Sequence, residues 1–98
     1  MATYTAVQAE HITTVANQVD TLTLTGTGTK IRFIVRSGTS HVFFTTAQPG
    51  GTPATPTVGG DDCLIGDPSG ALDYPWSGNG VVIKLIAGGI DTISIMLI

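Results

Sequence analysis

Apolar and polar residues alternate along most of this chain, and small clusters of Gly, Pro, Asn, Ser and Thr interrupt the alternation. A period of two is typical of a strand with one buried face, and the interruptions are typical of turns. The pattern predicts roughly eight short strands from nine candidate segments, of which the first two can be one bent strand. They cover residues 4–7, 11–15, 19–25, 30–37, 41–46, 63–65, 71–76, 81–87 and 90–98.

The composition favours the same structure, because 13 Gly and 5 Pro accompany few good helix formers. We therefore expect an all-β fold: an antiparallel two-sheet β-sandwich, jelly-roll-like, with about eight short strands. A length of 98 residues suits one domain spanning 1–98. Within it, residues 1–10 can form an extended N-terminal arm, and residues 47–62 form a long loop rich in Pro and Gly.

Two hairpins are predicted from the turn signals. Closing Thr25 onto Lys30 places Leu22 and Leu24 opposite Phe33 and Ile31 on one apolar face. The other face then carries three of the four cations, Lys30, Arg32 and Arg36. This row is either a solvated face that protects a sheet edge or a weakly basic strip that meets acidic groups on a partner.

The second predicted hairpin folds at Gly88-Gly89 and is mostly apolar on both faces. Its second face would carry Val82, Ile86, Ile93, Ile95 and Leu97. Because an antiparallel sheet in a small monomer normally has one wet face, this face needs a covering. Another protein chain can supply it, and so can a long loop or the N-terminal segment.

On the same face of this hairpin, Lys84 and Asp91 are expected to form an ion pair.

Pro49, Pro53 and Pro56 lie in the long loop and favour an extended backbone. The segment can be a flexible loop or an arm docked along a neighbouring chain. In the second case these prolines join the apolar hairpin face and the Arg32–Arg36 strip as candidate partner contacts.

Charged residues make up only 11% of the chain, and the net charge is −3. Four cations cannot neutralise a run of phosphates, so we expect no nucleic-acid partner. No apolar stretch of about 18 residues is free of charge, so no membrane span is predicted. One Cys forms neither an internal disulfide nor a Cys-based zinc site.

No constellation of residues predicts catalysis, a cofactor or a metal site. His11 and His41 lack a recognisable setting, Cys63 resembles a small apolar residue, and residues 66–70 around Ser69 look like a turn. Asp61, Asp62, Asp67 and Asp73 raise the alternative of a cation site, although their spacing matches no EF-hand loop. We therefore predict that the chain is not an enzyme.

Tyr74 and Trp76 alternate with Asp73 and Pro75 on one strand. They can face the core as a pair, or they can stack on a sugar ring if they face outward.

Several segments together resemble a known family, the small β-sandwich virion proteins of tailed phages that infect actinobacteria. The resemblance runs from about residue 16 to residue 98. It is carried by residues 17–24 (NQVDTLTL), 31–39 (IRFIVRSGT), 44–46 (FTT), 56–62 (PTVGGDD) and 82–86 (VIKLI). It is a pattern of strands and turns and brings no site residues with it.

The resemblance implies a capsid decoration or auxiliary protein on the outer surface of the head shell, made in the host cytoplasm. Its partner would be the lattice of the major capsid protein, with self-association, for example as a trimer. An alternative within the same resemblance is a minor tail or fibre protein that acts as a carbohydrate-binding adhesin, using Tyr74 and Trp76.

Overall fold

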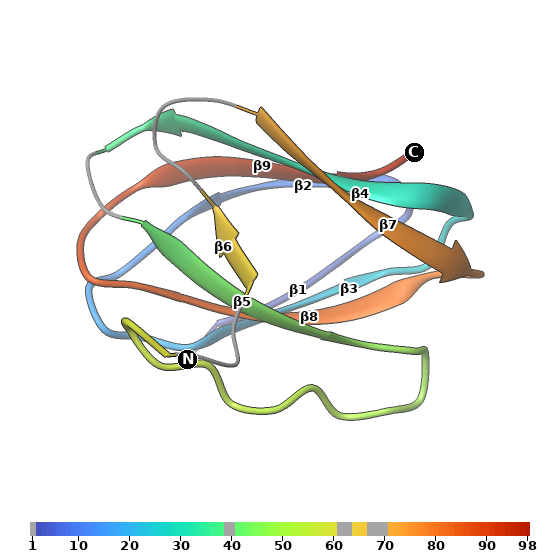
Figure 1. Cartoon of the computed structure of the whole chain (residues 1–98), viewed down its shortest axis with the longest axis horizontal. Helices are drawn as coiled ribbons and strands as arrows, with labels where there is room; N and C mark the ends of the chain where they lie inside the picture. The colour runs from blue at the N-terminus through green and yellow to red at the C-terminus, as the bar shows by residue number, and fades with distance from the viewer. Residues whose placement is uncertain (1, 39–40, 61–63, 67–70) are drawn as a thin grey trace.

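The computed structural model describes residues 2–38, 41–60, 64–66 and 71–98, with the backbone alone for 64–66. Nine strands lie in these ranges, and each overlaps one predicted from the sequence (Figure 1). They are β1 (Thr3–Ala6), β2 (Ala9–Thr13), β3 (Asp20–Leu24), β4 (Gly28–Ser37), β5 (Val42–Ala47), β6 (Leu64–Gly66), β7 (Ala71–Gly78), β8 (Val81–Ala87) and β9 (Thr92–Leu97).

The strands form a β-sandwich of two sheets. The five-stranded sheet has the order β1-β3-β8-β5-β6, and the four-stranded sheet has the order β2-β9-β4-β7. Figure 1 shows the four-stranded sheet above the five-stranded sheet. All neighbouring strands are antiparallel except β1 and β3, which are parallel.

The strand order confirms the predicted jelly roll. β5 pairs with β6, β4 with β7, β3 with β8 and β2 with β9, which makes one long antiparallel ribbon. The ribbon is rolled up, and the pairs β5·β8 and β4·β9 join its successive turns. This nesting of strand pairs is the topology of double-sheet jelly rolls.

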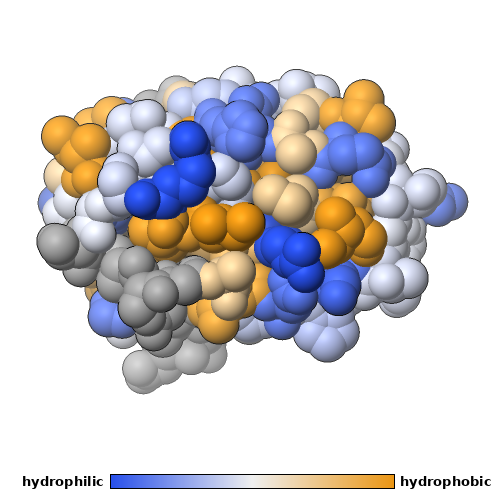
Figure 2. Space-filling model, turned by 90° about the horizontal axis from the view of Figure 1, so that it is seen from above, coloured by the Kyte–Doolittle hydropathy of each residue, from blue (hydrophilic) through white to orange (hydrophobic). Residues whose placement is uncertain are grey.

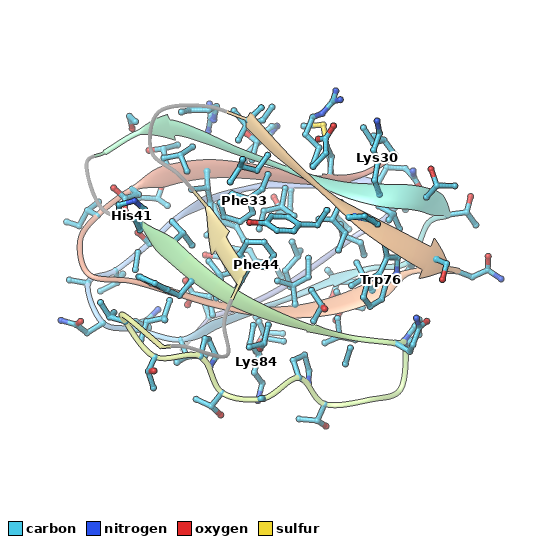
Figure 3. All side chains as sticks on the ribbon, in the orientation of Figure 1. Lys30, Phe33, His41, Phe44, Trp76 and Lys84 are labelled. Carbon is cyan, nitrogen blue, oxygen red and sulfur yellow. The ribbon has the colours of Figure 1, made fainter. Side chains whose placement is uncertain are left out.

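The core lies between the sheets. Phe33 of β4 and Phe44 of β5 stack with ring centroids 4.8 Å apart, and the Tyr74 ring meets Phe44 edge-on at 5.2 Å. Figure 3 shows Phe33 and Phe44 between the two layers. Around them lie fully buried aliphatic side chains, among them Ile12, Leu22, Leu24, Ile31, Ile83, Leu85, Ile93, Ile95 and Leu97.

Both predicted hairpins are wrong in their pairing. β3 and β4 belong to different sheets, as do β8 and β9, so residues 25–27 and 88–91 cross between sheets. The reason is the position of the apolar side chains. A β8–β9 hairpin would leave one of its two apolar faces exposed. Because β8 and β9 instead lie in opposite sheets, the odd-numbered residues of both strands point into the same core.

The crossover after β8 is held by Thr14. Its Oγ1 donates to the Gly89 carbonyl at 2.9 Å and accepts the Asp91 N–H at 2.8 Å, while its own N–H donates to the Asp91 carbonyl at 2.9 Å. Asp91 is only 1% exposed. The expected ion pair with Lys84 does not form, because Lys84 points out of the five-stranded sheet, away from the interior (Figure 3).

Candidate partner-binding surface

Three of the proposed contact residues lie in the core. Ile93, Ile95 and Leu97 are 0% exposed and pack between the sheets, so they cannot touch a partner of the folded chain. Val82 and Ile86 do lie on the outer face of β8, as predicted, with Val82 half-buried and Ile86 8% exposed. The exposed apolar face inferred from the hairpin is therefore absent from this part of the chain.

The outer face of β8 is covered from within the same chain. Residues 48–60, here called the strap, pass beneath the five-stranded sheet (Figure 1). Pro53 and Pro56 of the strap are buried, and the Thr45 hydroxyl on β5 donates a hydrogen bond to the Ala54 carbonyl. Of the two sequence-based alternatives, covering by a long loop of the same subunit is the one observed.

Contacts at both ends of β8 show how far the strap extends. A Cβ placed on Gly80, just before β8, would lie 3.4 Å from Pro49 Cγ, and one on Gly88, just after β8, would lie 3.7 Å from Val58 Cγ1. The strap therefore follows the whole strand. Pro49 and Val58 remain exposed at its ends.

The four-stranded sheet presents an outer face that no described segment covers. We call it the four-stranded face and define it by its outward side chains. Cα partners place them in rows across the strands: His11, Ser94, Ile34 and Ala71 in one row, and Ala9, Met96, Arg32 and Asp73 in the next. Lys30 and Pro75 form a third pair.

Ile34 and Met96 are half-buried and occupy neighbouring rows at the middle of this face. Small residues, Ala9 and Ala71, flank them and are exposed. Figure 2 looks onto this side of the molecule and shows apolar side chains gathered between polar ones. An apolar centre with Met and Arg and a polar surround is typical of protein–protein interfaces.

One side of the four-stranded face carries an ion-paired cluster. Arg32 Nε and Nη2 donate to the two Asp73 carboxylate oxygens at 2.8 and 3.0 Å, and Lys30 Nζ lies 3.6 Å from Oδ2. The hydrogen bond from Arg32 lowers the pKa of Asp73, with smaller contributions from the charges of Arg32 and Lys30, and raises the pKa of Arg32. The two-point contact fixes the orientation of the guanidinium relative to the Asp73 carboxylate.

Arg36 is exposed at the end of β4, and no ion pair involves it within the described residues. The three cations predicted to share one strand therefore stay together, and Asp73 neutralises one of them. The described residues of this part of the surface carry a net positive charge, on a chain whose total is −3. Arg32 and Arg36 are the proposed contact residues that the fold leaves best placed for a partner.

Sequence reasoning missed the pair formed by His11 and Ser94. His11 Nδ1 lies 2.7 Å from Ser94 Oγ across β2 and β9. No local pattern reveals this pair, because His11 and Ser94 are 83 residues apart and meet only when β2 and β9 become neighbours. Ser94 is only 3% exposed, so its hydroxyl is not placed to attack a substrate.

Tyr74 and Trp76 face inward, and the expectation that they pack against the core is confirmed. Both are half-buried, and Trp76 Nε1 donates to the Gly80 carbonyl at 2.9 Å. Asp73 and Pro75 face outward between them. The two rings therefore lie on the inner side of β7 and not on the outer face, where the sugar-stacking alternative requires them.

The described part of the chain forms no pocket, and it contains no group of three or more potential metal ligands. It also contains no helix long and apolar enough to cross a membrane. Asp61, Asp62, Cys63, Asp67 and Ser69 lie outside the described residues, and His41 is exposed.

The chain matches no family model and no curated protein sequence. Its fold is similar to several solved structures, including the following two. One is the pre-peptidase C-terminal domain of a collagenase from Bacillus anthracis, at 8% identity and a TM-score of 0.58, covering 100% of this chain and 95% of that one. The other is PliG of Aeromonas hydrophila, a periplasmic inhibitor of g-type lysozyme, at 12% identity and a TM-score of 0.54, with both chains fully covered. At these identities the likeness defines a class of fold, the small β-sandwich, and nothing more specific.

Proposed function

We propose that this chain is a structural protein of a tailed-phage virion: a capsid decoration or auxiliary protein that binds the outer surface of the head shell. The proposal rests on the sequence resemblance and on one structural observation. No described segment crosses the four-stranded face, whereas the strap covers β8 of the other sheet, and the four-stranded face has an apolar centre beside paired and unpaired cations.

A flat face of this kind suits binding to another protein rather than to a small molecule. Small-molecule sites are concave, whereas the described residues form no pocket. A protein that binds only the assembled shell adds its interface free energy to that state alone, so it stabilises the shell without chemistry. Many copies multiply a small stabilisation at each site.

The charge on this face indicates the character of the shell surface. Among the described residues, Lys30, Arg32 and Arg36 face outward near one carboxylate, Asp73. We expect the shell to present acidic groups around an apolar patch, because unlike charges at an interface rim speed association and select the correct partner.

Ile34→Asp tests whether the four-stranded face docks on the shell. The substitution places a charge in the apolar centre, so co-sedimentation with head shells that lack this chain should fall at least about tenfold. Val58→Asp makes the same kind of change on the strap, where Val58 is 47% exposed, and should leave binding unchanged. Circular dichroism confirms that both variants fold. Equal retention of Ile34→Asp and wild type on the shells would reject this face as the docking surface.

An adhesin function remains as the alternative to be tested on the same protein. The inward position of Tyr74 and Trp76 does not favour it. A glycan array probed with wild type should give no binding, and sugar-dependent binding without shell binding would support the adhesin instead.

A further inference from the structure

The backbone of β1 has hydrogen-bonding groups on its outer edge that no described residue pairs with. The Ala2 and Ala6 carbonyls accept from the Thr21 and Thr25 N–H groups at 2.9 and 3.0 Å. Because successive residues of a strand point their backbone groups to opposite sides, Thr3 and Thr5 direct theirs away from β3. β1 is the last strand of its sheet, so no described strand lies on that side. Its edge therefore offers two donors and two acceptors.

The outer edge of β2, on the same side of the sandwich, is closed by a side chain. The Leu97 N–H donates to the Gln8 carbonyl and the Thr14 N–H to the Asp91 carbonyl, so even-numbered residues of β2 face β9. His11 then directs its N–H outward, where Glu10 Oε1 accepts it at 3.0 Å. A carboxylate over an edge donor blocks an incoming strand, which is a recognised protection against edge pairing.

The outer edge of β7 is protected as well. Pro75 in the middle of β7 has no N–H to offer, and the Gln48 side-chain amide donates to the Ser77 carbonyl at 3.0 Å. The remaining edge strand, β6, has only three residues. Within the described structure, β1 is thus an edge of at least four residues with neither a charge nor a proline.

We propose that β1 pairs with β1 of a second copy of this chain, antiparallel and with the twofold axis at Tyr4. The sequence Thr3-Tyr4-Thr5 is symmetric about this residue, so the axis places Thr3 of each copy opposite Thr5 of the other. Both residues direct their N–H and C=O groups outward. Each opposed Thr3–Thr5 pair therefore exchanges two N–H to C=O hydrogen bonds between the copies.

This arrangement satisfies all four groups on each edge and joins the two five-stranded sheets into one continuous sheet. The outward side chains that meet are Thr against Thr, a favourable cross-strand pair without like charges. The interface is isologous, as twofold dimers require. Because so short an edge buries little surface, the free chain should form only a weak dimer, and the high local concentration on a lattice would favour it.

Sedimentation velocity on the full chain tests this pairing without any other component. Loading concentrations from about 10 µM to about 1 mM cover the range expected for a small interface. The weight-average sedimentation coefficient should rise with concentration toward that of a dimer. Thr5→Pro removes an outward N–H without touching the ladder to β3, and should shift the midpoint at least about tenfold upward.

Thr13→Pro is the matched control, because it removes an outward N–H from β2 and should leave the midpoint unchanged. If Thr5→Pro fails to fold, NMR spectra of the wild type at increasing concentration test the pairing instead. The Thr3 and Thr5 amide signals should shift, and the Thr13 amide signal should stay constant. A monomer at all concentrations would overturn the proposal, and so would an association that Thr5→Pro does not weaken. Neither result bears on shell binding through the four-stranded face.

Discussion

Two aspartates show how a carboxylate is held differently outside and inside the sandwich. Asp73 lies on the surface and is held by Arg32 and Lys30. Asp20 is 1% exposed, and its Oδ1 accepts from the Ala2 N–H at 3.0 Å and the Gln18 amide at 2.8 Å. Asp20 thus ties the start of β1 to β3 by hydrogen bonds, whereas Asp73 orients two cations for solvent or a partner.

At this scale, Arg32→Gln should raise the pKa of Asp73 toward the ordinary value of about 3.9, because the hydrogen bond from Arg32 is the largest cause of its lowering. A depressed carboxyl pKa stabilises the fold above the unfolded pKa, and this stabilisation is lost as the pH falls through the folded pKa. Carbon-detected NMR titration of the Asp73 carboxyl measures the shift. Arg36→Gln is the control, and an unchanged Asp73 pKa in Arg32→Gln would contradict the assigned cause.

The elements show which parts of the fold the sequence could predict. Alternation correctly placed Leu22, Leu24, Ile31 and Phe33 inward, because a side chain's face depends only on its position within its own strand. Strand partners were wrong, since a short Gly-rich connection can close a hairpin or cross between sheets. That choice depends on the opposite sheet, which buries Ile93 and Ile95. No local pattern reveals which sheet will cover them.

The candidate surface was predictable to a similar degree. Arg32 and Arg36 were placed correctly on the outside of β4, because charge and alternation agree there. Ile34 shares the outer face of β4 with Arg32 by the same alternation, whereas Met96 was not identified as a neighbour of Arg32, because β4 and β9 become adjacent only in the rolled-up ribbon. The strap's position also depends on tertiary contacts, since an extended proline segment has no preferred partner of its own.

Deleting residues 51–57 from the strap should destabilise the domain, because it uncovers Ile86 and the apolar part of β8. Exposing one Ile side chain costs roughly 1.5–3 kcal/mol, so the free energy of unfolding should fall by about 2 kcal/mol or more. Urea unfolding followed by circular dichroism measures it. The double substitution Thr52→Ala and Thr55→Ala, at exposed strap positions, should stay within about 0.5 kcal/mol of wild type. Unchanged stability of the deletion would show that the strap does not hold the outer face of β8.

At the scale of the whole molecule, charge separates two sides of the sandwich. Lys30, Arg32 and Arg36 lie on β4 of the four-stranded sheet, whereas Lys84 points from β8 toward the strap (Figure 3). Although the chain totals −3, the described residues of this face therefore carry a positive excess. If this face meets acidic groups on a head shell, the position of a cation matters more than the net charge.

Arg36→Glu and Lys84→Glu separate position from net charge, because each changes the total from −3 to −5 by replacing one positive with one negative charge. Arg36→Glu should slow association with head shells by about tenfold at low salt, since it reverses an exposed charge beside the docking face. Lys84→Glu should leave association near the wild-type rate. The difference should shrink as salt approaches about 1 M, where screening shortens to about 3 Å. Surface plasmon resonance on immobilised shells measures both rates. Equal slowing by the two variants would show that only net charge acts, and would leave the basic side of the four-stranded face without a role in binding.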